Sequence, residues 1–164
     1  MPSNSPRRIL FLTPQLPYPP EQGAALRNYS LIRHVARRHD VSLLTFAAEP
    51  CPSAGPLTAL CRVVRTVEPP LRSRGARLRT LALSRLPDMA HRLHSAAFAA
   101  ALRELVTHER FDVLQIEGIE MAPYGSLLRT WLGDDAPLVV YDDHNAEYVL
   151  QKRAFLADAR RLAR

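Results

Sequence analysis

Short apolar runs alternate with longer amphipathic stretches along this chain. The apolar runs have the length of β-strands and occupy residues 8–13, 40–47, 61–67, 111–117 and 137–142. The stretches between them have helical periodicity, and this alternation is typical of a parallel sheet with crossover helices. We therefore expect an α/β fold, a Rossmann-like open parallel sheet with helices on both faces.

Two of the intervening stretches have a clear apolar face. In residues 24–40 the side chains on one helical face are Ala25, Tyr29, Ile32, Val35 and Ala36. In residues 96–109 the apolar stripe consists of Phe98, Ala101, Leu102, Leu105 and Val106. Helices are also predicted over 119–132 and from Ala146 to the C-terminus, whereas proline punctuates the predicted loops 49–56 and 67–75.

Length and composition predict one domain. The 164 residues, 47% of them hydrophobic, are enough to bury a sizeable core. Residues 1–7 are expected to form a disordered tail and residues 8–164 the domain. No apolar stretch has the length of a signal peptide core or approaches the roughly 18 residues of a membrane span. Cys51 and Cys61 form no CxxC pair, so we expect two reduced thiols in a cytoplasmic protein.

Arginine dominates the charge of the chain. The 22 Lys+Arg against 16 Asp+Glu give a net charge of +6, and Lys152 is the only lysine. This charge favours phosphate-bearing ligands or an anionic membrane surface. Nucleic acid is not indicated, because the sequence has no aromatic-and-basic ladder and no zinc-ligand spacing. The arginine- and leucine-rich segment 71–87 predicts either a basic amphipathic helix, peripheral on the inner face of a membrane, or a crossover helix on the sheet.

Polar residues follow three of the predicted strands, and ligands bind at the carboxyl ends of strands in such sheets. After the first strand, Gly23 at a helix start would let the backbone approach a phosphate, although it can equally relieve a turn. Arg27 can reach the same anion or a surface carboxylate. After the fourth strand, the Glu117 carboxylate and Gly118 stand at the ligand edge, whereas Glu120 is better explained as an acidic residue in a first helical turn.

The fifth strand ends in the most polar stretch of the chain, VVYDDHNAEY. Its polar residues are Asp142, Asp143, His144, Asn145 and Glu147. An Asp or Asn can cap the next helix, and His144 can be a structural histidine, but capping explains only one of the five. We expect these groups to converge on a ligand cleft.

Three segments of the chain carry a resemblance to a known family. The sequences ILFLTPQLPYPPEQGAALRNYSLIRHVARRHDVSLLTF, FDVLQIEG and VVYDDHNAEY, in this order and spacing, resemble the N-terminal half of the family 4 GT-B glycosyltransferases, the retaining group 1-like enzymes. The resemblance runs from Arg8 to Arg153. It implies two Rossmann-like domains, with the acceptor mostly on the N-terminal domain and the nucleotide-sugar donor mostly on the C-terminal one.

The resemblance also assigns roles to the strand ends. It implies that Gly23 approaches the donor diphosphate and that His144, the expected catalytic residue, faces the donor sugar near its anomeric carbon. The expected substrate-binding residues are Gly23, Ala24, Arg27, Glu117, Gly118, Asp143, Asn145 and Glu147. Ala24 departs from the family, in which a second glycine is common, and its methyl group puts the closeness of the phosphate contact in doubt. Members of the family generally need no metal, and we expect no cofactor.

The resemblance implies that residues 8–164 are a truncated acceptor-side domain without its donor-binding domain. We therefore expect the chain to be inactive alone and to need a C-terminal GT-B domain, in cis or in trans, to transfer sugar to a glycan or lipid acceptor. Two other functions are open at this stage. One is a free-standing module that docks an acceptor, a membrane or a partner; the other is a small phosphohydrolase with a metal at Asp142, Asp143 and His144.

Overall fold

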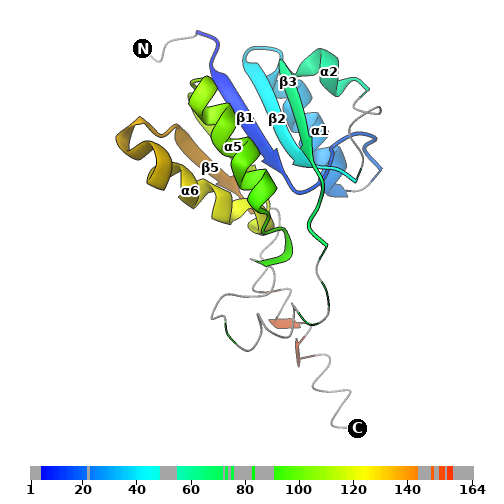
Figure 1. Ribbon diagram of the computed structural model, residues 1–164. Helices are drawn as coiled ribbons and strands as arrows, with labels where there is room; N and C mark the ends of the chain where they lie inside the picture. The colour runs from blue at the N-terminus through cyan, green and yellow to red at the C-terminus, as the bar shows by residue number, and fades with distance from the viewer. Residues whose placement is uncertain are drawn as a thin grey trace.

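The structure, a computed structural model, describes residues 5–21, 23–48, 55–71 and 91–143, together with residues 73, 75, 83, 149, 152, 153, 155 and 156. A five-stranded sheet with the order β3-β2-β1-β4-β5 forms its centre (Figure 1). The strands are β1 (Arg8–Thr13), β2 (Asp40–Phe46), β3 (Val63–Val67), β4 (Val113–Glu117) and β5 (Leu138–Asp142). All neighbouring strands are parallel, and each lies within one of the predicted apolar runs, so the predicted α/β fold is confirmed.

Helices cover both faces of this sheet (Figure 1). On one face lie α1 (Gly23–Val35) and the short α2 (Leu57–Leu60). On the other lie α5 (Ala96–His108) and α6 (Ala122–Leu132), with the single 3-10 turns η1 (Ile119–Met121) and η2 (Gly133–Asp135) before and after α6. The chain leaves β1 for one face and the neighbouring β4 for the other. This change of side is the position at which doubly wound sheets open a ligand crevice.

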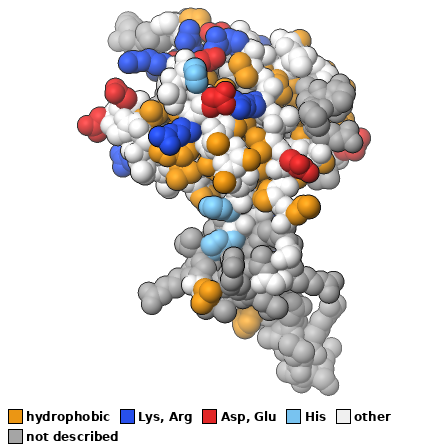
Figure 2. Space-filling view, viewed as in Figure 1, with side chains coloured by type: hydrophobic (Ala, Val, Ile, Leu, Met, Phe, Trp, Pro, Cys, Tyr) orange, Lys and Arg blue, Asp and Glu red, His pale blue; other side chains and the backbone are white. Residues whose placement is uncertain are grey.

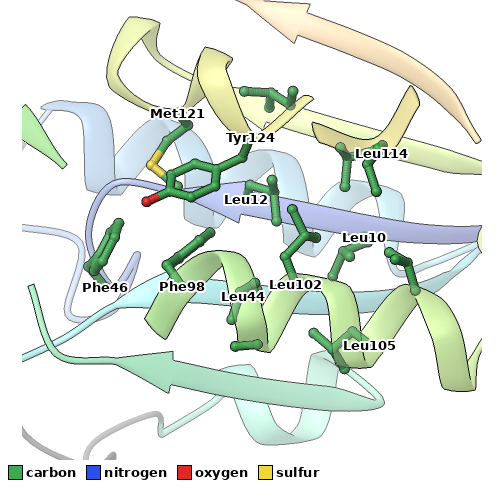
Figure 3. Close-up of a cluster of buried hydrophobic side chains, with 14 residues drawn as sticks. Leu10, Leu12, Leu44, Phe46, Phe98, Leu102, Leu105, Leu114, Met121 and Tyr124 are labelled. Carbon is green, nitrogen blue, oxygen red and sulfur yellow. The ribbon is translucent and has the colours of Figure 1, made fainter. Parts of the chain in front are cut away.

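The larger hydrophobic core lies between the sheet and the helices α5 and α6. Figure 3 shows Leu10, Leu12 and Leu114 of the strands against Phe98 and Leu102 of α5. The Phe98 ring stacks on Phe46 with centroids 4.4 Å apart and lies 4.6 Å from the Tyr124 ring. Successive strand residues point to opposite faces, so Phe11, between Leu10 and Leu12, packs in the second core under α1.

Hydrogen bonds fix the start of α5 against α6. The Tyr124 hydroxyl donates to the Leu93 carbonyl oxygen over 2.6 Å and accepts from the Ser95 N–H over 2.9 Å. The Ser95 side chain caps α5 by accepting from the Phe98 N–H. Burial raises the pKa of the Tyr124 hydroxyl, which favours the protonated form that donates to Leu93.

The predicted apolar stripes are largely confirmed. In α5 the five buried residues are the five predicted ones. In α1, Ala25 and Ile32 are buried, whereas Tyr29 and Val35, together with Ala36 directly after the helix, are partly buried against the second core. The helix ends at Val35, before the polar residues that lead into β2. The third buried residue of α1 is Asn28, which the apolar pattern did not include.

Several other predictions fall partly or wholly outside the described residues. A helix was predicted from Ala146 to the C-terminus. The described residues of that segment are helical, namely Val149, Lys152, Arg153, Phe155 and Leu156. Most of segment 71–87 lies outside the described residues, and so does Cys51. Cys61 is described, buried and free of a disulfide. Within the described part of the chain, no helix has the length and hydropathy needed to cross a membrane.

Candidate ligand site at the carboxyl edge of the sheet

The carboxyl ends of β1, β4 and β5 lie side by side. Parallel register places Leu12 next to Ile116 and Glu117 next to Asp142. The first residue of α1, Gly23, follows β1 after the loop 14–22, and η1 follows β4. The described residues that the sequence predicted at three separate strand ends, from Gly23 to Asp143, therefore belong to one edge of the sheet.

Asp142 connects three elements at this edge. Its carboxylate forms an ion pair with Arg27 of α1, and the two side chains are 43% exposed for Arg27 and 29% for Asp142. Its carbonyl oxygen accepts a hydrogen bond of 3.0 Å from the Gly118 N–H at the end of β4. The sequence left two partners open for Arg27, the anion bound near Gly23 or a surface carboxylate. In the structure, Arg27 pairs with the carboxylate of Asp142.

Gly118 turns the chain sharply out of β4. Its φ of +90° lies in the region that side chains rarely adopt, and a Cβ there would lie 3.2 Å from Oε2 of Glu120. Glu120 itself lies in the first turn of η1 and forms an ion pair with Arg92 over 3.5 Å. Glu120 is thus an acidic residue in a first helical turn, as the sequence favoured. Glycine is needed at position 118 because the turn requires a positive φ.

Comparison with known proteins identifies the family. The glycosyl transferase 4-like domain matches the chain over residues 22–164, from just before α1 through β5 and beyond. The chain belongs to this family. The resemblance read from the sequence is therefore confirmed, and membership implies a domain that takes part in binding a sugar donor and an acceptor. No curated protein matches the chain significantly.

The start of α1 is open in this glycosyl transferase 4-like domain. Gly23 and Ala24 are both exposed, and no described protein atom lies within 4 Å of the place that a Cβ on Gly23 would take. Helix N-termini carry free N–H groups and a partial positive charge. Arg27, one turn later, adds a guanidinium whose charge is offset in part by its ion pair with Asp142. This arrangement suits an anion.

Glu117 lies deeper than the sequence suggested. Leu114 and Ile116 point into the core under α5 and α6, so strand alternation directs Gln115 and Glu117 to the α1 face. The Glu117 side chain is fully buried and accepts a hydrogen bond of 2.8 Å from Nε2 of Gln115. The glycosyl transferase 4-like domain thus encloses this carboxylate at the ligand edge.

Three residues of the predicted site lie outside the described residues, namely His144, Asn145 and Glu147. Asp143 is described and is exposed directly after β5. The described residues contain no cluster of three or more His, Cys, Asp or Glu side chains that would suit a metal ion. The roles predicted for the DDHN stretch remain predictions.

Asn28 is the polar residue that the sequence interpretation missed. It is fully buried in α1, and neither its amide nitrogen nor its amide oxygen has a hydrogen-bond partner among the residues that the structure describes. A buried unsatisfied polar group costs about 1–3 kcal/mol. The signal was available, because Asn28 lies three residues after Ala25 and four before Ile32, on the stripe that faces the sheet.

Proposed function

We propose that this glycosyl transferase 4-like domain is the acceptor-side half of a retaining glycosyltransferase. Such an enzyme transfers a sugar from a nucleotide-sugar donor to a glycan, lipid or other acceptor. The observation that supports this proposal best is the convergence at Asp142, which joins the Arg27 side chain of α1 to the ends of β4 and β5. The described residues proposed to meet the donor therefore come from elements that meet at one edge of the sheet.

The proposed chemistry needs positive potential at the start of α1. Cleavage of the bond between the anomeric carbon and the diphosphate builds positive charge on the sugar and negative charge on the leaving group. The N–H groups at Gly23 and Ala24 would stabilise that negative charge, as fixed donors do in oxyanion sites. Arg27 remains partly exposed while it pairs with Asp142, so its guanidinium keeps donors available for an anion. No metal is required by this arrangement.

The sugar side of the site would be formed by the residues after β4 and β5. His144 is proposed to face the anomeric carbon, as the resemblance implies. Hydroxyl groups of the substrates would bind Asp143, Asn145 and Glu147. Glu117 is fully buried, so it is proposed, with Gly118, to shape this edge rather than to contact the sugar. Most groups that bind the nucleotide are assigned to a C-terminal GT-B domain, supplied in cis or in trans, so residues 8–164 alone are proposed to be inactive.

The role of His144 can be tested by substitution in a protein that includes both GT-B domains. His144→Ala should lower the rate of sugar transfer at least a hundredfold, since positioned side chains in such sites contribute about 10²–10⁴-fold. His34→Ala provides the matched control, because His34 is exposed in the last turn of α1, at the end of that helix that leads into the start of β2 and lies away from the carboxyl edge. Transfer that is equal in the two variants, with both folded, would remove His144 from the proposed site.

A further inference from the structure

We propose that Asp142 is a specificity-determining residue, whose carboxylate weakens binding of the nucleoside diphosphate product more than binding of the nucleotide-sugar donor. This inference rests on the proposed function, in which the diphosphate lies at the start of α1 beside Arg27. The proposed chemistry needs positive potential there, yet the guanidinium of Arg27 is in contact with a carboxylate. Asp142 therefore acts on whatever anion Arg27 binds.

Asp142 is held beside Arg27 by its backbone as well as by its side chain. Its carbonyl oxygen accepts a hydrogen bond of 3.0 Å from the Gly118 N–H, and in the parallel register it lies next to Glu117. Its carboxylate forms the ion pair with Arg27 and stays partly exposed. An anion bound to the same guanidinium consequently lies within a few ångströms of this carboxylate.

The described part of the edge that would receive the diphosphate is acidic. Arg27 is the one basic residue in the described segments 14–21, 23–27, 118–120 and 142–143, which lie at the ends of β1, β4 and β5. The carboxylates of the same segments are those of Glu21, Glu120, Asp142 and Asp143. Glu120 pairs with Arg92. Asp142 is thus the carboxylate in contact with the arginine that is proposed to bind the donor.

Exposed arginines gather at the opposite edge of the sheet, where the strands begin. Figure 2 shows Lys and Arg side chains close together at the top of the view, over the starts of the strands in Figure 1. The described arginines near this edge include Arg7, Arg8, Arg37 and Arg38, all of them exposed. The arginine excess of the described residues therefore does not offset the charge of Asp142 at the ligand edge.

The negative charge of the nucleotide increases during the proposed transfer. The bond between the anomeric carbon and the diphosphate oxygen breaks, and its electron pair stays on that oxygen. The acceptor oxygen bonds to the anomeric carbon, and its proton passes to solvent at a pH above the phosphate pKa of about 6. The nucleotide sugar carries about two negative charges, whereas the nucleoside diphosphate that leaves carries about three.

A fixed carboxylate beside the diphosphate opposes the product more strongly than the donor. At a separation of about 6 Å, one additional pair of like unit charges lowers affinity about threefold even with the dielectric constant of water. This separation is shorter than the Debye length of about 8 Å at physiological salt, so much of the repulsion survives screening. Asp142 thus favours the exchange of spent nucleotide for fresh donor.

The proposal can be tested by titrating the isotope-labelled chain with UDP and with UDP-glucose at about pH 7.5, following the amide signals of Gly23 and Arg27. Asp142→Asn should bind both ligands more tightly than the unchanged protein, and the gain in affinity should be about threefold larger for UDP. Asp142→Glu keeps the charge and should retain the ratio of the two affinities. The β-methyl ester of UDP has the charge of the donor without its sugar, so its affinity should change as that of UDP-glucose does.

Asp135→Asn provides the matched control, because it removes the same charge from an exposed residue near the other end of β5. It should leave the ratio of the two affinities unchanged. If both ligands bind at this edge and Asp142→Asn changes their affinities equally, or if Asp135→Asn changes the ratio as much, the role of Asp142 is overturned while the proposed function stands. If neither ligand shifts the signals of Gly23 and Arg27 in any of these proteins, the proposed function fails and the inference fails with it.

Discussion

The guanidinium of Arg27 in α1 pairs with the carboxylate of Asp142 at the end of β5, although 115 positions separate the two residues in the chain. The pair brings the N-terminal turn of α1 to the end of the fifth strand. Both side chains are partly exposed, so solvent screens their attraction. Its main consequence is the position of Arg27 at the ligand edge.

The energetic contribution of this pair should be small. In a double-mutant cycle with Arg27→Gln and Asp142→Asn, we expect a coupling free energy of about 0.2–1 kcal/mol, typical of exposed ion pairs. Urea unfolding of the four proteins measures it. A coupling above about 2 kcal/mol, a magnitude reached by hydrogen bonds to charged groups, would mean that the pair is a major stabilising contact rather than a positioning one.

Asn28 should destabilise the free protein. Asn28→Leu replaces two unsatisfied amide atoms by methyl groups on a side chain with the same branching, so the free energy of unfolding should rise by about 1 kcal/mol. Urea unfolding provides the measurement, with Ser30→Leu at an exposed α1 position as the control for helix propensity. A decrease of 1 kcal/mol or more in Asn28→Leu would show that the amide is hydrogen-bonded in solution.

Cys61 should make stability fall at alkaline pH. Burial raises the pKa of its thiol from about 9.0 to about 12, so between these values the unfolded chain releases a proton that the folded chain retains. Stability from this group is complete below pH 9 and is lost as pH rises toward 12. Compared with Cys61→Ala, the protein should lose about 1.4 kcal/mol more per pH unit in this range. The measurement is urea unfolding of both proteins at pH 8 to 10.5. If their free energies of unfolding changed with pH in parallel, the raised pKa would be contradicted.

The elements of this fold were predictable because their signals are local. Phe98, Ala101 and Leu102 repeat at helical spacing, and the five apolar runs each contain a strand. The contact between Arg27 and Asp142 was not predictable, because it depends on the spatial order of strands that the sequence does not state. Glu117 is deeply buried because its side chain lies on the α1 face of β4. That orientation is known only from the structure, in which Leu114 and Ile116 face α5 and α6.

Segment 71–87 supplies a prediction from sequence alone, since most of it lies outside the described residues. If it docks on an anionic membrane, co-sedimentation with vesicles that contain phosphatidylserine should weaken steeply with salt, because each arginine near the surface contributes about 1 kcal/mol. Replacing Arg72, Arg74 and Arg77 with glutamine should release the protein. The matched control is the same triple replacement at Arg33, Arg37 and Arg38, near the end of α1. Sedimentation that is absent at low salt, or that survives the change in segment 71–87, leaves only a structural role for the segment.

The proposed half-enzyme is tested most directly by titrating the isolated chain with nucleotide sugars, such as UDP-glucose and GDP-mannose, under NMR observation. The amide signals of Gly23, Arg27, Gly118 and Asp143 should shift together, because these residues share one edge of the sheet. Affinity should be millimolar or weaker, corresponding to about −4 kcal/mol at best, since most groups that bind the nucleotide are assigned to the other domain. Binding in the micromolar range, or shifts that avoid this edge throughout the titration, would contradict the proposed acceptor-side domain.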